Sequence, residues 1–187
     1  METNIYLGIG WLVYGVIHSV LASESIKNKI STQYYRLIYN ALAIILMIPL
    51  FYWLTTKPSA SMMPSSLISQ LLSGLMILSG IYIIYLSFKN YDVKEFLGLN
   101  FKDNQGKQIL QTEGLSSLIR HPLYTGTLLF VWGLFGYFTT EAYFITAVCL
   151  TLYIRIGIYF EEKKLLKTFG KSYQKYQKEV PMLIPKI

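Results

Sequence analysis

Five apolar stretches dominate this chain of 187 residues and restrict the folds that are open to it. They cover residues 5–21, 37–54, 67–88, 123–138 and 143–160. A helix needs about 20 mainly apolar residues to cross the hydrocarbon core of a bilayer. The stretches therefore predict an all-α, polytopic membrane protein with about five transmembrane helices, in which residues 1–187 form a single domain.

The composition supports a lipid environment, because 53% of the residues are hydrophobic and 14% are charged. The net charge of +7 first suggests nucleic acid. However, the basic residues lie beside the apolar stretches and no groove-reading motif accompanies them, so we expect a lipid bilayer and no nucleic acid as partner. Cys149 is the only cysteine, which excludes an intrachain disulfide. We expect no metal site, and the oligomeric state stays open.

The lysines and arginines indicate an orientation. They concentrate after the first stretch, between the third and fourth, and after the fifth, whereas the opposite side carries only Lys57. Cytoplasmic loops of membrane proteins hold the excess of basic residues. The pattern predicts an inner (cytoplasmic) membrane protein with its N-terminus outside, its C-terminus in the cytoplasm, and outer loops at 55–66 and 139–142. Residues 1–4 carry no basic residue, so we expect the first stretch to be a retained helix.

Two segments outside the apolar stretches have amphipathic character. Residues 89–119 mix charged and apolar side chains, which predicts a structure lying at the membrane surface. Residues 161–179 carry apolar side chains every three or four positions, with lysines between them. This second pattern predicts a cytoplasmic amphipathic helix that ends before Pro181. Together the two segments are expected to cover the cytoplasmic side of the bundle.

The segment 120–126 reads Arg-His-Pro-Leu-Tyr-Thr-Gly at the cytoplasmic start of the fourth stretch. Pro122 suits the first turn of a helix, which places His121 near the N-cap. The free N–H groups and positive pole of that end favour a bound carboxylate, and the guanidinium of Arg120 adds donors for the same anion. Alternatively, Arg120 is a membrane anchor, His121 an interfacial residue and Pro122 a helix starter.

A pair of carboxylates, Glu161 and Glu162, follows the fifth stretch directly. If the helix ends there, its dipole opposes them, so the pair is expected to serve a cation. Arg155 precedes Glu162 by two helical turns and shares its face. An arginine inside a span is expected to face the bundle interior or a water-filled cavity, unless it reaches out to the headgroups.

Further polar residues lie near the same predicted membrane face, where the first stretch ends and the second begins. Each alone is more typical of helix packing or of the interface, but folding can assemble them with Arg120 and Glu161 into one pocket. We assign His18 and Arg155 as candidates for orienting or deprotonating an acceptor, a role that requires hydrogen-bonding reach. The candidates for substrate binding are Arg36, Tyr39 and Asn40.

These residues resemble those of a family of integral membrane methyltransferases. The family includes isoprenylcysteine carboxyl methyltransferase, phospholipid methyltransferases and bacterial methanethiol S-methyltransferase. The resemblance is strongest over residues 120–185, where the Arg-His-Pro segment precedes a helical hairpin and the Glu-Glu pair. Residues 18–23, 36–40 and 96–99 look more like the methanethiol-methylating branch.

The resemblance implies an S-adenosylmethionine cofactor held on the cytoplasmic side by residues of 120–185. The acceptor would be the thiol or carboxylate of a small or lipophilic molecule that enters from the bilayer. A phospholipid N-methyltransferase and a non-catalytic scaffold or transporter stay open as alternatives. Carried over by motif position, the cofactor-binding residues would be Arg120, His121, Pro122, Leu123, Tyr124, Gly126, Glu161 and Glu162.

Overall fold

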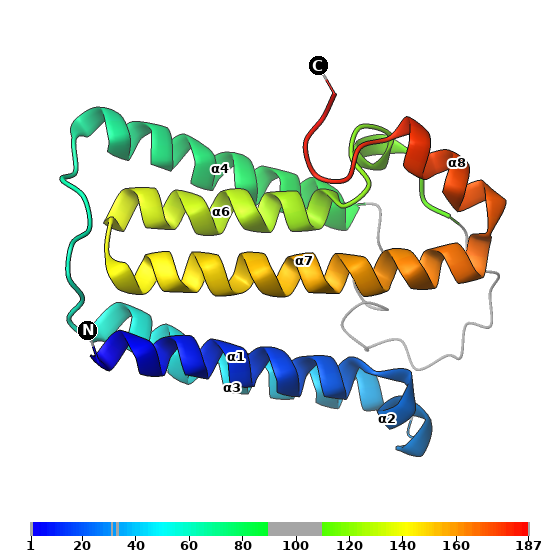
Figure 1. Ribbon diagram of the computed structural model, residues 1–187, viewed down its shortest axis with the longest axis horizontal. Coiled ribbons are helices and arrows are strands. Elements are labelled where there is room, and N and C mark those ends of the chain that lie inside the picture. The colour runs from blue at the N-terminus through cyan, green and yellow to red at the C-terminus, as the bar shows by residue number, and fades with distance from the viewer. Residues whose placement is uncertain (1, 31, 33, 90–109, 187) are drawn as a thin grey trace.

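The computed structural model describes residues 2–30, 32, 34–89 and 110–186, and the described part is a helical bundle (Figure 1). The predicted all-α class is therefore confirmed. The elements are, in order, α1 (Glu2–Ala22), α2 (Glu24–Lys29), α3 (Tyr35–Thr56), α4 (Leu67–Lys89), the 3₁₀ helix η1 (Gly114–Ser117), α6 (Pro122–Phe138), α7 (Glu141–Phe169) and α8 (Lys171–Glu179).

Four of these helices, α1, α3, α4 and α7, are long and apolar enough to cross a membrane. The chain is therefore an integral membrane protein. Large apolar side chains such as Leu67 and Ile68 point outward along them, as expected of surfaces that face lipid. The remaining predicted span is α6, which is helical as predicted but has 17 residues. It packs against α4 and α7.

The helices form three layers, with α7 in the middle (Figure 1). On one side α7 contacts α6, which in turn packs along α4. On the other side α7 contacts α1, and α1 packs on α3. Polar residues on opposite faces of α7 therefore meet different helices. The face of α7 on which a candidate residue lies thus determines which other candidates it can contact.

Helices α4 and α6 approach closely because glycines face each other. A Cβ atom on Gly80 would lie 2.6 Å from the backbone nitrogen of Phe130 and 2.7 Å from the carbonyl oxygen of Gly126. A Cβ atom on Gly126 would lie 2.9 Å from the carbonyl oxygen of Gly80. Small residues allow this contact between membrane helices.

The layer of α1 and α3 is joined to α7 by an apolar core and by hydrogen bonds, of which that of Trp11 is buried. Leu7, Tyr14 and Leu54 form this core with their neighbours. The indole nitrogen of Trp11 donates to Oγ1 of Thr146 over 3.0 Å. A buried N–H group with a partner avoids the desolvation cost that it would otherwise carry.

At the end of the bundle opposite α8, the connector after α3 is fastened to the turn between α6 and α7. Helix α3 stops at Thr56 because Lys57 precedes a proline and is extended, with ψ of 136°. The backbone nitrogen of Met62 then donates to the carbonyl oxygen of Thr139 over 2.8 Å. The predicted connectors at 55–66 and 139–142 are thus confirmed as connectors that meet at one end of the molecule.

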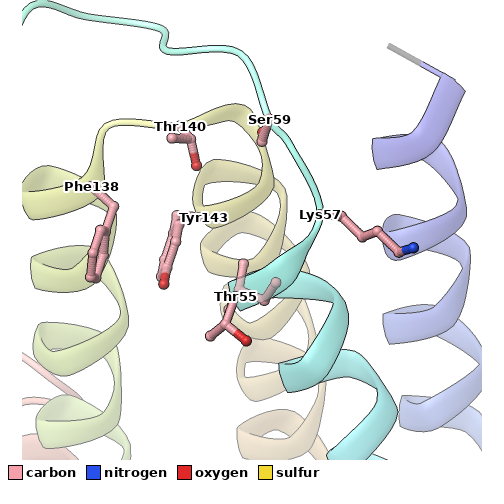
Figure 2. A pocket seen from close by; sticks show the side chains of 7 residues that line it. Thr55, Lys57, Ser59, Phe138, Thr140 and Tyr143 are labelled. Atoms are coloured by element: carbon pink, nitrogen blue, oxygen red, sulfur yellow. The ribbon is translucent and has the colours of Figure 1, made fainter.

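A pocket of about 400 Å³ lies at this same end, far from the Arg-His-Pro segment (Figure 2). Its polar residues come from the end of α3, the connector and the start of α7. The phenyl ring of Phe138 stacks on the ring of Tyr143, with centroids 4.5 Å apart. The lining residues are Leu54, Thr55, Lys57, Ser59, Phe138, Thr140 and Tyr143.

The predicted amphipathic helix over 161–179 is wrong in its start. Helix α7 continues without a break to Phe169, and the chain turns at Gly170, which has a φ of +53°. A positive φ is a conformation that glycine adopts without strain. Helix α8 then ends at Glu179, before Pro181 as predicted. Glu161 and Glu162 therefore lie about two turns inside α7, so the opposing dipole of a helix end does not explain them.

Part of the predicted surface segment 89–119 lies outside the described residues. This part includes 96–99, on which the resemblance to the methanethiol-methylating branch partly rested. The described part contains η1 and Ile119, whose side chain is buried beside the start of α6.

Candidate functional site

The start of α6 is built as the sequence predicts. Pro122 is the first helical residue and His121 is the N-cap, with φ of −125° and ψ of 65°. Both residues are buried. Proline is favoured at this position because its missing N–H has no partner in the first turn of a helix. His121 and Pro122 thus begin α6 next to the residues that follow α8, since the carbonyl oxygen of Pro181 accepts from the backbone nitrogen of Arg120.

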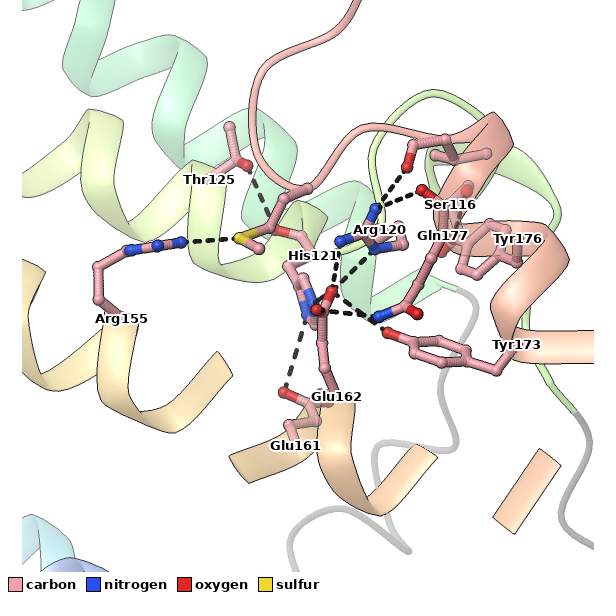
Figure 3. A network of polar contacts seen from close by, with 12 residues as sticks. Ser116, Arg120, His121, Thr125, Arg155, Glu161, Glu162, Tyr173, Tyr176 and Gln177 are labelled. Carbon is pink, nitrogen blue, oxygen red and sulfur yellow. Dashed lines mark hydrogen bonds and ion pairs between the residues drawn. The ribbon is translucent and has the colours of Figure 1, made fainter. Parts of the chain in front are cut away.

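Glu162 is the centre of this site (Figure 3). Its Oε1 accepts from Nε of Arg120 at 2.8 Å and from Nη2 of the same guanidinium at 2.6 Å. Nε2 of His121 lies 3.1 Å from the same oxygen. Helix α8 adds the hydroxyl of Tyr173, which donates to Oε1 at 3.4 Å, and Nε2 of Gln177, which donates to Oε2 at 3.1 Å. We call these five residues the Glu162 hub.

The hub is largely shielded from solvent. The side chain of Glu162 is 14% exposed and that of Arg120 is 8% exposed. Ionised groups are tolerated at such depth when they are paired and hydrogen-bonded, and removal of one partner is costly. Burial and the neighbouring carboxylate of Glu162 raise the pKa of Tyr173 above its ordinary value, so its phenol stays protonated and donates at neutral pH.

Arg120 also fixes the end of the chain against α6. Its Nη1 donates to the carbonyl oxygens of Gln177 and Val180, at 3.1 and 2.6 Å. The backbone nitrogens of Arg120 and His121 donate to the carbonyl oxygens of Pro181 and Met182, at 2.9 and 3.1 Å. The Arg120 guanidinium, which we expected to add donors for an external anion, therefore donates to groups within the protein. The physical reason is that the last turn of α8 and the residues after it present their carbonyl oxygens to these donors.

Glu161 differs from Glu162 in its surroundings. Its side chain is 43% exposed, and its Oε2 lies 3.8 Å from Nδ1 of His121. Helical geometry turns adjacent side chains about 100° apart, so one carboxylate points into the hub and the other toward its rim. Tyr124 stacks its ring on His121, with centroids 5.6 Å apart and planes 28° apart. Glu161 is thus the more exposed of the two carboxylates, and Tyr124 lies against the imidazole ring of the site.

Gly126 has another setting. It lies in the contact with α4, where the carbonyl oxygen of Gly80 would be 2.9 Å from an added Cβ. The close approach that this glycine permits is therefore to a neighbouring helix. Leu123 lies in the first turn of α6 and is half-buried.

A second polar cluster lies between α1, α3 and α7. Nδ1 of His18 is 2.7 Å from the hydroxyl of Tyr153, and Nε2 is 2.6 Å from the hydroxyl of Tyr39. A neutral imidazole has one donor and one acceptor nitrogen, so one phenol donates to the ring while the other accepts from it. We call His18, Tyr39 and Tyr153 the His18 cluster. It confirms that the predicted residues His18 and Tyr39 lie together.

The expected convergence of His18 with the Arg-His-Pro segment does not occur. Tyr153 and Glu162 are nine residues apart on α7, which is two and a half turns. They face opposite sides of the helix and are separated by about 13 Å along its axis. Arg155 lies on the hub side, where its Nη1 donates to Sδ of Met182. Of the other expected pocket residues, Arg36 is exposed and Asn40 is half-buried, both in the first two turns of α3.

Sequence reasoning missed three residues of these clusters, Tyr153, Tyr173 and Gln177, and also Met182, which contacts Arg155. Tyr173 carried a signal in the sequence, since it belongs to the apolar repeat after the fifth stretch. In the structure its side chain is 1% exposed. Tyr153 carried none, because the apolar stretch around it has no polar face that marks the inward side. Met182 follows a proline outside any periodic pattern.

Comparison with known proteins assigns the chain to a family. Residues 68–172 match the family model described as phospholipid methyltransferase. This range contains α4, α6, α7 and three of the hub residues, Arg120, His121 and Glu162. No solved structure matches the chain significantly.

Several individual proteins are also similar. A methanethiol S-methyltransferase of a Pseudomonas species is 38% identical over 99 residues, which cover 53% of this chain and 37% of that protein. Methanethiol S-methyltransferase 2 of Bradyrhizobium diazoefficiens is 29% identical over 187 residues, covering 94% of this chain and 70% of that protein. Protein-S-isoprenylcysteine O-methyltransferase of Schizosaccharomyces pombe is 36% identical over 84 residues, covering 42% of this chain and 34% of that protein.

The family match spans more than half of the chain and includes the residues that build the centre of the hub. The chain therefore belongs to the phospholipid methyltransferase family of integral membrane proteins.

Proposed function

We propose that this protein transfers a methyl group from S-adenosylmethionine to the thiol of a small acceptor of the methanethiol kind. The relatives that cover most of this chain are named methanethiol S-methyltransferases. The observation that carries the proposal is the meeting of the Arg-His-Pro segment of α6 with the two glutamates of α7. These residues are 40 to 42 positions apart in sequence, and their contact builds a charged site at one end of the bundle.

The residues at the rim of the hub fit the cofactor chemically. S-adenosylmethionine carries an ammonium group and ribose hydroxyls, and a carboxylate is a strong acceptor for both. Glu161 offers such a carboxylate with 43% of its side chain exposed. The ring of Tyr124, stacked on His121, offers an aromatic surface for an adenine base.

Arg120, His121 and Glu162 act as positioning residues in this proposal. Glu162 orients both basic side chains, and Arg120 holds the segment after α8 over the start of α6. The hub thereby joins three helices into one rigid wall and keeps water away from one side of the site. His121 lies between the two carboxylates and fixes the position of Glu161 relative to the hub.

When bound, the cofactor would supply an electrophilic methyl group on a sulfonium sulfur. The contribution of the chain is to hold the acceptor in line with that methyl group and to exclude water. Such alignment alone is worth about 7–11 kcal/mol in intramolecular reactions. Of the two predicted candidates for orienting or deprotonating the acceptor, Arg155 lies on the hub side of α7, whereas His18 lies in the cluster on the opposite face.

The orientation in the membrane is also a proposal. Lys27 and Lys29 on α2 lie at the same end of the bundle as α8 and its lysines, whereas Lys57 lies at the other end (Figure 1). The excess of basic residues places the hub end in the cytoplasm. In a Cys149→Ala background, Lys175→Cys should react with a membrane-impermeant maleimide only after the cytoplasmic side is opened. Lys57→Cys should react from outside. Labelling of both cysteines from the same side would refute the proposed orientation.

A labelled-methyl assay tests the proposed reaction. The purified protein is supplied with S-adenosylmethionine and, in parallel, with ethanethiol, a prenylcysteine analogue and phosphatidylethanolamine. We expect the highest turnover with the thiol. Transfer to phosphatidylethanolamine alone would support the second candidate, a phospholipid N-methyltransferase, which the description of the family model favours. If no acceptor is methylated and S-adenosylhomocysteine does not bind, the protein is a non-catalytic scaffold or transporter and the proposed function is refuted.

A further inference from the structure

An unusual contact joins Arg155 of α7 to the segment after α8. Nη1 of Arg155 donates to the thioether sulfur of Met182 over 2.8 Å. Figure 3 shows the guanidinium directed from α7 toward the side of the hub on which His121 lies. The side chain of Arg155 comes from the apolar part of a helix that is able to span the membrane.

The thioether is a poor match for this guanidinium. A methionine sulfur is a weak, uncharged acceptor, whereas a guanidinium offers five N–H donors. Among the residues that the structure describes, Met182 is the acceptor that Arg155 meets. Arg155 is exposed on the surface of α7, and a guanidinium in the apolar part of a membrane-spanning helix is expected to take a strong or anionic partner. An anion in the place of the thioether would therefore bind Arg155 more strongly than Met182 does.

The contact lies next to the hub. Arg155 and Glu162 are two turns apart on one face of α7, about 10 Å along the axis. The backbone of Met182 is at the start of α6, where its carbonyl oxygen accepts from the nitrogen of His121. Its side chain then reaches from there to Arg155. The sulfur thus lies between the deeper part of α7 and the residues proposed to hold the cofactor.

We propose that Arg155 is the subsite for the sulfur of the acceptor, and that the thioether of Met182 occupies this place until a thiolate displaces it. This inference rests on the proposed function, because it assigns the acceptor end of the same reaction. The ligand class is a small thiol in its anionic form. Met182 would act as a positioning residue that competes with the acceptor for Arg155.

Charge decides which sulfur Arg155 binds. A guanidinium repels the sulfonium of the methyl donor and attracts a thiolate, whose formation a nearby cation favours. The thiol proton leaves to water before transfer. A lone pair of the thiolate sulfur then forms the new bond to the methyl carbon. The bond from that carbon to the donor sulfur breaks, and its electron pair remains on the donor sulfur, which becomes a neutral thioether.

Isotope-labelled methionine methyl groups report on the displacement without turnover. The chain has six methionines, and the Met182 signal is identified by its loss in Met182→Leu. Ethanethiol added to the wild-type protein in detergent should shift this signal in a saturable manner. Ethanol, which forms no anion at neutral pH, should leave it in place. The signals of Met62 and Met63 at the opposite end serve as internal controls.

Kinetics of two variants test the same competition. Met182→Leu keeps the volume of the side chain but removes the sulfur, so the KM for the thiol should fall about threefold to tenfold. Arg155→Gln should raise this KM about tenfold or more, with unchanged affinity for S-adenosylhomocysteine, and Arg155→Lys should restore part of the loss. Met62→Leu and Lys57→Gln, at the far end of the bundle, are the matched controls.

The outcomes separate this inference from the proposed function. If thiols are methylated, but the Met182 signal does not move and both variants keep the wild-type KM, Arg155 is not the acceptor subsite. If the Met182 signal responds to ethanethiol although no methyl transfer is detected, the thiol subsite stands and the proposed reaction fails. A response in Arg155→Gln equal to that of the wild type would also refute the role of Arg155.

Discussion

The two polar clusters of this protein lie on opposite faces of the same helix and differ in chemistry. The Glu162 hub holds a carboxylate, a guanidinium and an imidazole under the cover of α8. The His18 cluster joins an imidazole to two phenols, with no acidic partner among the described residues. Charged groups need compensation when buried, whereas the second cluster needs only its hydrogen bonds.

The family match falls unevenly on these clusters. Residues 68–172 include Arg120, His121 and Glu162, but not His18 and Tyr39, which belong to α1 and α3. Helix α7 contributes to both clusters, through Glu162 on one face and Tyr153 on the other. The hub therefore lies in the part shared with the family, whereas the His18 cluster joins α7 to helices outside the matched range.

The largest effect is expected from neutralising the centre of the hub. Glu162→Gln leaves the guanidinium of Arg120, 8% exposed, without its anionic partner. Breaking a buried ion pair on one side costs about 3–5 kcal/mol. The free energy of unfolding in detergent should fall by this amount, and affinity for S-adenosylhomocysteine should fall with it. The control Glu179→Gln, at an exposed pair with Lys175, should lower the free energy of unfolding by less than about 1 kcal/mol. Equal losses in the two variants would show that the hub stabilises the protein no more than an exposed ion pair does.

A smaller loss of stability is expected from a substitution at the contact of α4 and α6, which lies on the hub side of α7. In Gly80→Ala the new methyl group would meet backbone atoms of Phe130 and Gly126 within 2.7 Å. Overpacking of this kind costs about 1–3 kcal/mol, which thermal unfolding in detergent measures. Gly74→Ala on the same helix meets nothing within 4 Å and serves as the control. An equal fall in unfolding temperature for both variants would contradict the close packing.

A change in the His18 cluster should affect stability less. Tyr153→Phe removes one phenol partner of His18, and a single hydrogen bond is worth about 0.5–1.5 kcal/mol. Because Tyr153 faces away from the hub, the dissociation constant of S-adenosylhomocysteine should change by less than about twofold, a negligible free energy. A large loss of cofactor affinity would instead show that the two clusters are coupled across α7.

The smallest effect concerns alkaline pH. The folded protein raises the pKa of Tyr173 above the ordinary value of about 10, so its protonated form is favoured by folding. The stabilisation it contributes is present below about pH 10 and is lost as the pH rises toward the folded pKa. In pH-dependent unfolding, Tyr173→Phe should therefore lose less stability above pH 10 than the wild type does. Parallel curves for the two proteins would contradict the burial of this phenol beside Glu162.

The helices and part of the site could be predicted because lipid imposes simple rules. Apolar stretches located the helices to within a few residues, except that α7 runs on to Phe169. The meeting of the Arg-His-Pro segment with Glu161 and Glu162 followed from the resemblance to the family. The side of α7 that each residue faces could not be predicted, because spanning helices are apolar all round and carry no periodic sign of their packed face. The docking of Pro181 and Met182 depends on backbone hydrogen bonds, which leave no pattern in the sequence.

Calorimetric titration with S-adenosylhomocysteine tests the central claim most directly, since that claim makes Glu161, at the rim of the hub, a ligand of the cofactor. The wild-type protein and Lys163→Gln should give the same saturable binding isotherm. Glu161→Gln should bind about tenfold more weakly or worse, because it loses a hydrogen bond to a charged group. A flat isotherm for the wild type at high protein concentration, or unchanged binding by Glu161→Gln, would contradict the account.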